Sequence, residues 1–444
     1  MDLTQFKRST IASTVCLLVV TLHVSKANAT DLQDAYKLAQ QYDSAIKAAE
    51  YDYDSAIERL PLARSAFRPQ VNATLEYSVN EQNNDAFGIF DTGTLSLSIT
   101  QSLFDRENWA IVSQARLGVK QAEAQLLAQQ QNLILRTANA YFDVLRAQVE
   151  VKFSQSELEA IARQKEQAER RFDVGLVPVT DVRTAQAQFD LAVAAEIAAE
   201  NALENAQGAM QVITGITPES IAPLAADLPL VAPDPASMDK WVAFAHEQNL
   251  DLQAARLAAR TAEAGVASAR GSRYPTLGVA LVGQKLEHEK DSALTPRDLE
   301  AGVLRFEVNM PLYSGGRISS QVRQAKADSA SANQSLLSQE RETAQQAQDA
   351  YRGVTGSIAR ANALRQALTS TRKSAEATDA GFRAGTRTSV EVLQSLRDVF
   401  GAESDYAGAR YDYIINYLSL KAAAGTLREE DLIPINNFLV KQGS

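Results

Sequence analysis

Two patterns of hydrophobic and polar positions divide this chain. Four short stretches alternate between apolar and polar residues with a period of two, which is typical of β-strands; they are 71–79, 95–100, 304–310 and, more weakly, 277–281. Two long stretches without proline, 70–177 and 312–433, are rich in alanine, glutamine, leucine and glutamate. Because these residues favour helix and proline interrupts helix interiors, the second pattern predicts very long helices.

The two longest predicted helices span 107–172 and 317–380, and each would extend for about 100 Å. Shorter helices are predicted at 31–64, 181–212, 238–270 and 390–424. Helices of such length need a neighbouring helix along most of their course. The many alanines permit close approach between helices but leave few large side chains for a thick core. A thin-walled tube of many helices satisfies both conditions.

The chain also repeats itself at a spacing of about 210 residues, since the segments 171–175 and 180–182 return as 381–385 and 390–392. This spacing is far longer than the repeat of a solenoid, so it indicates a duplicated half-molecule. We expect a signal peptide at 1–29, a first structural repeat at 30–221 and a proline-rich linker at 222–236. A second repeat at 237–430 and a C-terminal tail at 431–444 complete the predicted organisation.

The predicted signal peptide has a basic start with Lys7 and Arg8, an apolar core at 11–24 and a small-x-small cleavage site at 27–29. The chain's one cysteine, Cys16, lies in this segment, so the mature protein would have no thiol, which suits an oxidising compartment. The net charge of −10 argues against binding to nucleic acid. After the signal, no stretch of 18 apolar residues predicts a transmembrane helix.

The alternating stretches form two predicted strand hairpins, 70–102 and 276–310, whose polar tips at 80–93 and 283–302 would be extracellular loops. Alternation alone fits either a half-buried soluble sheet or an outer-membrane barrel, and the signal peptide and long helices favour the barrel. Four strands cannot close a barrel, and lipid tolerates no open sheet edge, so several chains must share one. Three chains would supply twelve strands, although the sequence itself does not select three.

Three aromatic residues, Phe104, Tyr274 and Tyr313, lie close to the predicted junctions between helices and strands. They could form the aromatic girdle that outer-membrane barrels place at the periplasmic interface. They could equally be ordinary packing residues, and the sequence does not separate these two interpretations.

The stretches RFDVGLVPVTDV at 171–182 and GFRAGTRTSVEVL at 381–393 resemble the paired helical-tip motifs of the TolC family of outer-membrane efflux proteins. The segments 103–105, 138–145 and 424–427 also fit this family. The resemblance implies a homotrimer in the outer membrane of a Gram-negative bacterium. It would combine a shared twelve-stranded β-barrel with a coiled-coil periplasmic tunnel, without a cofactor or metal. The family's role would be passive export of drugs, small molecules or secreted proteins.

The same resemblance implies roles for residues at the tips. An entrance latch would join Asp181 and Arg387 of neighbouring coiled coils, with Thr180 as a second acceptor. A weaker link would join Gln164 and Asp379. Phe382 stands where a tyrosine would donate a hydrogen bond to Asp181, so we expect a looser latch.

At the pore constriction, the resemblance implies a selectivity ring with Glu391 as its carboxylate, while Gln394 replaces a second one. The expected ring of three carboxylates would attract cations less strongly than a ring of six. The tip turns would dock a periplasmic adaptor that works with an inner-membrane pump or ABC transporter. They comprise Val174, Gly175, Leu176, Ala384, Gly385 and Thr386.

The sequence gives little support to an enzymatic function, because His246 and His288 are the only histidines after the signal and no catalytic motif occurs. An alternative function is a periplasmic coiled-coil structural or adaptor protein without a pore. A further alternative keeps the channel but restricts it to protein secretion, and no residue separates that from drug efflux.

Overall fold

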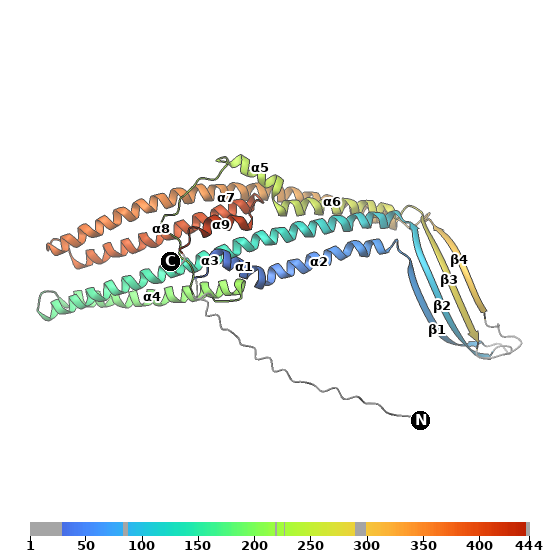
Figure 1. Ribbon diagram of the computed structural model, residues 1–444, viewed down its shortest axis with the longest axis horizontal. Helices are drawn as coiled ribbons and strands as arrows, with labels where there is room; N and C mark the ends of the chain where they lie inside the picture. The colour runs from blue at the N-terminus through green and yellow to red at the C-terminus, as the bar shows by residue number, and fades with distance from the viewer. Residues whose placement is uncertain (1–28, 83–87, 218–219, 226, 289–298, 441–444) are drawn as a thin grey trace, which may run out of the picture.

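The computed structural model describes residues 29–82, 88–217, 220–225, 227–288 and 299–440. Nearly all of the predicted signal peptide, together with the centres of the predicted loops at 80–93 and 283–302, lies outside these described residues. Two helical hairpins occupy one end of the molecule and a four-stranded sheet occupies the other (Figure 1).

The two long helices predicted from the sequence are confirmed. Helix α3 spans Arg106–Asp173 and helix α7 spans Arg317–Arg383. Helices α4 (Val179–Thr214) and α8 (Ser389–Ala423) run back along them, so α3 with α4 and α7 with α8 form two hairpins (Figure 1). None of the helices in the described part of the chain combines the length and apolar character required to cross a bilayer.

Two predicted helices are each broken once, so the prediction of continuous helices at 31–64 and 238–270 was wrong. Helices α1 (Leu32–Tyr42) and α2 (Ser44–Ser65) meet at Asp43, and α5 (Met238–Gln248) and α6 (Leu250–Gly271) meet at Asn249. Both residues are extended, and each side chain accepts a 2.9 Å hydrogen bond from the amide three residues on. These N-caps stabilise a new helix start at equivalent places in the two repeats.

All four predicted strands are confirmed and form one antiparallel sheet in the order β1-β2-β3-β4. The strands are β1 (Gln70–Gln82), β2 (Gly88–Phe104), β3 (Thr276–His288) and β4 (Leu299–Asn309). They run further into the predicted loops than the alternating stretches indicated. The register places Leu75 opposite Leu95, and Leu281 opposite both Ile99 and Leu304. Since paired residues share a face, most of the large apolar side chains lie together on one side of the sheet.

The buried core lies midway along the helices, where the two repeats meet. Tyr141 of α3 is fully buried, and its hydroxyl donates a 2.8 Å hydrogen bond to the Ala222 carbonyl at the start of the predicted linker. The linker then pairs with the C-terminal segment that follows η1 (Glu429–Asp431) and α9 (Leu432–Asn436), because Leu224 bridges to Leu439. The linker and the C-terminal segment therefore pack against the buried core at the middle of the helices.

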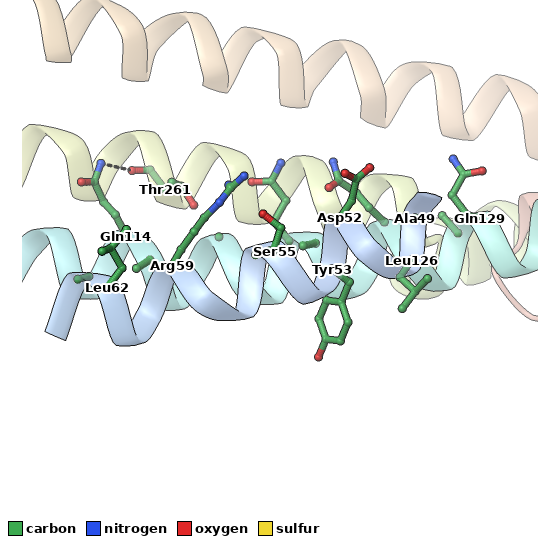
Figure 2. Close-up of a pocket in the computed structure, with 18 of the residues that line it drawn as sticks. Ala49, Asp52, Tyr53, Ser55, Arg59, Leu62, Gln114, Leu126, Gln129 and Thr261 are labelled. Atoms are coloured by element: carbon green, nitrogen blue, oxygen red, sulfur yellow. Dashed lines mark hydrogen bonds between the residues drawn. The ribbon is translucent and has the colours of Figure 1, made fainter. Parts of the chain in front are cut away.

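A cavity of about 1270 Å³ lies between α2, α3 and α6, on the side of the core towards the sheet (Figure 2). Its lining combines alanines with polar side chains such as Asp52, Arg59 and Gln129. Gln114 of α3 donates a 3.3 Å hydrogen bond to the Thr261 carbonyl of α6 across it. The site residues predicted from the sequence lie near the hairpin tips, at the opposite end of the helices, and none of them lines this cavity.

Candidate functional site

The two hairpins end in the same backbone turn. Gly175 and Gly385 adopt the left-handed conformation, with φ of 76° and 77°, which glycine accepts without a Cβ clash. At each tip, the residue after the glycine donates its amide to the carbonyl five residues back, with 2.8 and 2.9 Å between nitrogen and oxygen. This bond and a second from the glycine amide form a Schellman motif, which satisfies the last helical carbonyls.

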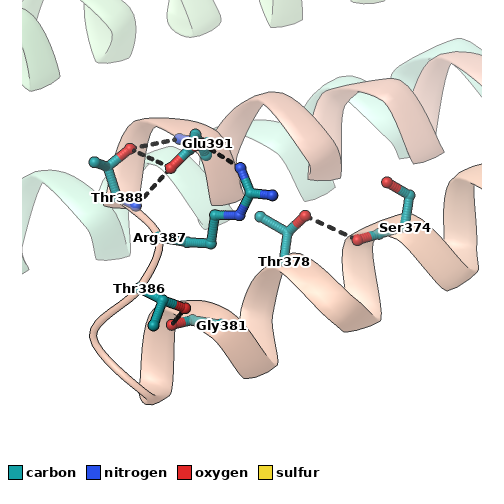
Figure 3. A network of polar contacts seen from close by, with 7 residues as sticks. All are labelled: Ser374, Thr378, Gly381, Thr386, Arg387, Thr388 and Glu391. Carbon is teal, nitrogen blue, oxygen red and sulfur yellow. Dashed lines mark hydrogen bonds and ion pairs between the residues drawn. The ribbon is translucent and has the colours of Figure 1, made fainter.

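The side chains at the two tips differ. Val174 and Leu176 of the first tip are 69% and 73% exposed, so they present apolar surface to the surroundings. The corresponding Ala384 and Thr386 of the second tip are smaller, and the Thr386 hydroxyl donates to the Gly381 carbonyl at 3.0 Å (Figure 3). All three predicted docking positions of the second tip are exposed.

The second tip begins α8 with a complete capping box. Glu391 donates its amide to the Thr388 hydroxyl at 3.3 Å, and its carboxylate accepts from the Thr388 amide at 2.7 Å (Figure 3). Arg387 Nη1 donates to the other carboxylate oxygen at 2.8 Å. The Thr388 amide, the Arg387 guanidinium and the Thr388 hydroxyl together lower the pKa of Glu391 to about 2, because all three stabilise its charged form.

This cap was missed in the sequence analysis although the sequence carries its signature. Thr388 followed three residues later by Glu391 is the spacing of a capping box before an apolar run. Glu391 therefore has a local structural role besides the pore role that the family resemblance implied. Its carboxylate also forms an ion pair with Arg387, which immediately precedes the N-cap of α8.

The first tip starts α4 without a side-chain cap, because Pro178 occupies the N-cap position. The Thr180 hydroxyl donates to Asp181 Oδ1 at 3.4 Å, a long hydrogen bond. Asp181 lies in the first turn of α4, where a carboxylate interacts favourably with the helix dipole. Asp181 is thus exposed and only weakly bound within its own hairpin.

A cavity of about 340 Å³ separates the two hairpins near their tips and brings several predicted residues together. Gln164 and Asp181 line it from the first hairpin, and Thr388 and Gln394 line it from the second. Gln188 also lines it, and its buried Oε1 atom accepts no hydrogen bond from the described residues. The cavity therefore offers acceptor groups that a donor from outside this chain could satisfy.

Other predicted tip residues have partners that the sequence did not reveal. Asp379 binds Arg383, one turn along α7, at 2.6 Å. The Arg171 guanidinium of the first hairpin lies 5.3 Å from the centre of the Phe382 ring of the second, a cation–π contact. The predicted link between Asp181 and Arg387 would join neighbouring coiled coils and stays a prediction, since Arg387 binds Glu391 here.

Ion pairs farther from the tips join α3 to α8. Arg397 binds Glu157 at 2.6 Å, and Arg146 binds Asp412 at 2.7 Å. Sequence reasoning missed these residues because the partners are 240 or more positions apart. The residues that the structure describes contain no cluster of three or more side chains suited to hold a metal ion.

Comparison with known proteins agrees with this geometry. The model of the family described as outer membrane efflux protein matches residues 35–216 and 241–426. The outer membrane protein TolC of Vibrio cholerae is 35% identical over 410 residues, covering 92% of this chain and 93% of that protein. The alkaline protease secretion protein AprF of Pseudomonas aeruginosa is 28% identical over 428 residues, covering 91% of this chain and 86% of that protein.

The fold is shared with solved structures as well. The crystal structure of the outer membrane protein VceC from Vibrio cholerae superposes with a TM-score of 0.75 at 20% identity, covering 89% of this chain and 96% of that one. The family is one of channels, so the alternatives of an enzyme and of a coiled-coil protein without a pore do not hold. The chain belongs to the outer membrane efflux protein family, as an outer-membrane channel whose trimer continues a shared twelve-stranded barrel into a helical tunnel in the periplasm.

Proposed function

We propose that the two hairpin tips form the closed periplasmic entrance of this channel, held by a link between Asp181 and Arg387 of neighbouring coiled coils. The observation that carries the proposal is the cavity between the hairpins, in which Asp181 faces residues of the second hairpin. Asp181 is exposed and only weakly bound within its own hairpin, so it remains available to a guanidinium. Thr180 is a second acceptor beside it.

Arg387 can serve this link without releasing Glu391. A guanidinium has five N–H donors, and one nitrogen of Arg387 is engaged by Glu391. The remaining donors can reach a carboxylate on the other side, while Glu391 fixes the side chain's direction. An exposed ion pair contributes about 0.2–1 kcal/mol, so three copies in a trimer make a latch that a docking protein can open.

Two further contacts adjust this latch. Phe382 cannot donate a hydrogen bond to Asp181, but its ring accepts the Arg171 cation, and an exposed contact of this kind contributes about 0.5–1 kcal/mol. The contact joins the two hairpins of one chain and compensates in part for the missing hydroxyl. The link between Gln164 and Asp379 is the weaker one, because Asp379 must share its charge with Arg383.

Glu391 and Gln394 form the proposed selectivity ring. Gln394 donates to Asp398 at 2.9 Å and carries no charge, so one carboxylate per chain remains in the ring. Arg387 neutralises part of that charge, and the exposed Arg383 lies four residues earlier, at the end of α7. We therefore expect weak cation selectivity and weak block by divalent cations.

The exposed tips support docking of a periplasmic adaptor, which would connect the channel to an inner-membrane pump or ABC transporter. Val174 and Leu176 give an apolar contact, and Gly175 keeps the turn narrow. Ala384, Gly385 and Thr386 give the second tip a smoother, more polar surface.

The cargo would be selected by the pump rather than by this chain. The family description supports efflux of small molecules, and the likeness to a protease secretion protein supports protein export. We infer that the channel conducts passively and can serve either a drug-efflux system or a protein-secretion system.

The sheet supports direct contact with outer-membrane lipid. Its apolar face carries exposed side chains such as Leu75, Phe306 and Val308, which are 81%, 67% and 69% exposed. The opposite face carries Asn72, Glu76 and other polar groups on β1. An apolar exterior and a polar interior are the arrangement that a membrane barrel requires.

Single-channel conductance in a planar bilayer tests the latch. The purified mature trimer would be compared with Arg387→Ser and with Arg365→Ser, a control that removes an exposed arginine of α7 away from the tip. We expect a small wild-type conductance that rises clearly in Arg387→Ser and changes little in Arg365→Ser.

Equal conductance in Arg387→Ser and wild type would reject the latch while leaving the channel intact. Asp181→Asn should raise conductance as well, and adding it to Arg387→Ser should bring little further increase, because both variants break the same link. A protein that conducts no ions at all would instead contradict the channel.

A further inference from the structure

Helices and strands meet at four places in each chain, all at the same end of the molecule (Figure 1). We call the segments 64–70, 103–109, 270–276 and 310–317 the junction collar. The collar contains six arginines and two carboxylates, within a chain whose net charge is −10. All six arginines are exposed: Arg64, Arg68, Arg106, Arg270, Arg273 and Arg317.

The collar's carboxylates are occupied by neutral partners. Asp105 caps α3 by accepting from the Asn108 amide at 3.1 Å, and Glu107 accepts from the Ser272 hydroxyl at 2.6 Å. Among the described residues, none of the six arginines forms an ion pair with a carboxylate. The arginines of the second tip, Arg383 and Arg387, are both ion-paired, so the collar is cationic in a way that the tip is not.

Aromatic side chains place part of the collar on the lipid-facing side. Trp109 is 56% exposed, and its ring centre lies 5.5 Å from that of Phe104 and 6.3 Å from that of Phe67. Phe104 pairs with Leu277 across the β2–β3 ladder, which puts it on the apolar face of the sheet. The aromatic group therefore continues that face towards the helices.

Arg106 belongs to the same side. It lies three residues before Trp109 on α3, and residues at this spacing share one helix face. Its guanidinium carbon is 4.5 Å from the centre of the Tyr274 ring, which holds the cation beside the aromatic group. Of the predicted girdle residues, Tyr274 thus lies beside Arg106 and Phe104 lies beside Trp109.

We propose that the junction collar binds anionic phospholipid headgroups of the periplasmic leaflet. The inference rests on the proposed contact between the sheet and lipid, and it adds a headgroup class to that contact. A guanidinium binds a phosphate through two parallel N–H donors, and aromatic rings settle at the boundary between headgroups and acyl chains. With no carboxylate of the described residues paired to these arginines, phosphates are suitable counter-ions. A matching charge strengthens binding about fivefold for each arginine that reaches the headgroups.

The fluorescence of Trp109 can report this contact. It has two tryptophans, of which Trp241 is only 4% exposed while Trp109 lies in the collar. Brominated acyl chains quench a tryptophan they touch. The mature trimer would be reconstituted in phosphatidylcholine vesicles with increasing shares of dibrominated phosphatidylglycerol, or of dibrominated phosphatidylcholine as the zwitterionic comparison. Trp109→Phe, in which quenching should disappear, identifies the signal.

We expect half-maximal quenching at a severalfold smaller share of the anionic lipid than of the zwitterionic one. The variant with Arg68, Arg106, Arg273 and Arg317 changed to Gln should lose this preference, and changing the same four to Lys should keep most of it. Arg341→Gln with Arg365→Gln, which removes exposed arginines of α7 away from the collar, should leave it unchanged.

An anionic preference that survives the fourfold Gln change would overturn the proposal, as would equal loss in the α7 control. Absence of quenching by both brominated lipids is a different result, because it would contradict the lipid contact of the sheet itself rather than its headgroup preference.

Discussion

The two hairpin tips have the same backbone and different side-chain chemistry. Both turn at a glycine in the left-handed conformation, and both close with the same pair of amide hydrogen bonds. The second tip binds Glu391 into a capping box and attaches Arg387 to it. The first tip starts its return helix at Pro178 without a side-chain cap and leaves Asp181 facing the cavity.

This difference shows what a duplicated chain keeps and what it changes. The turn geometry is kept because any other residue at the glycine would strain the backbone. The residues beside the turn are free to diverge. The second tip carries Arg387, which is already bound to Glu391, whereas the first tip carries Asp181, which is only weakly bound. The proposed link between Asp181 and Arg387 would join two tips that differ in this way.

The largest expected effect comes from glycines at the other ends of the return helices. Gly215 and Gly425 both have positive φ, at 77° and 72°. A Cβ at Gly425 would lie 2.2 Å from the Gln248 carbonyl oxygen, whereas one at Gly215 would meet the Tyr42 side chain at 2.7 Å. Backbone cannot move aside as a side chain can, so Gly425→Ala should cost several kcal/mol and Gly215→Ala about 1–3 kcal/mol.

Thermal unfolding followed by circular dichroism, at one scan rate in detergent, measures this difference. A lower midpoint for Gly425→Ala than for Gly215→Ala would support it. Equal midpoints would mean that the Asn249 break accommodates the methyl group as readily as Tyr42 does.

A smaller effect should distinguish the two tips directly. Thr388→Ala removes the N-cap hydroxyl of α8 and should weaken that helix start by about 1 kcal/mol. Thr180→Ala is the matched control in the first tip, where the hydroxyl makes one long bond to Asp181 and caps no amide. Hydrogen–deuterium exchange should quicken in the first turn of α8 in Thr388→Ala, and stay near wild type in the first turn of α4 in Thr180→Ala. Similar changes in both helices would remove the contrast between the tips.

The pH should affect the second tip through Glu391. Its pKa falls from an ordinary 4.5 to about 2 in the folded chain, so its contribution is complete above pH 4.5 and is lost as the pH falls towards 2. Exchange protection of the α8 first turn should therefore exceed that of Glu391→Gln at pH 5 and above, and the two proteins should converge near pH 2. A constant difference down to pH 2 would show that the carboxylate does not titrate there.

The smallest effect tests the aromatic position at the second tip. Phe382→Tyr introduces a hydroxyl that can donate to Asp181, a hydrogen bond worth about 0.5 kcal/mol at this position, and should lower the single-channel conductance. Phe172→Tyr is the matched control, because Phe172 holds the equivalent place in the first hairpin and is 42% exposed. An unchanged conductance in Phe382→Tyr would contradict a role of position 382 in the latch.

Much of this architecture could be predicted because its causes are local. The absence of proline and the supply of helix-forming residues located α3, α4, α7 and α8 to within a few residues, and alternation located all four strands. Glycine at a repeated position predicted both turns. The breaks at Asp43 and Asn249 were missed, since an Asx residue inside a helix-forming stretch does not show whether it will cap a new start.

The candidate site was predictable in part. Its residues were identified by resemblance and their roles stay predictions, although Gln164, Asp181 and Gln394 line one cavity between the hairpins. The capping box of α8 could have been predicted from the local Thr388-x-x-Glu391 spacing but was overlooked. The Arg171–Phe382 contact had no such signal, because its members lie on different hairpins.

By itself, the sequence determined the helices, strands and turns, because helix propensity, side-chain alternation and glycine conformation act within a few residues of the chain. Tertiary structure alone decided which face of the sheet meets which neighbour, how linker and tail close the core, and which charges find partners. Those outcomes depend on residues as far apart as Glu157 and Arg397, whose distance is set by the packing of whole helices. The collar arginines were recognisable for the same reason, since the absence of a carboxylate partner among the described residues can be seen only when neighbours in space are known.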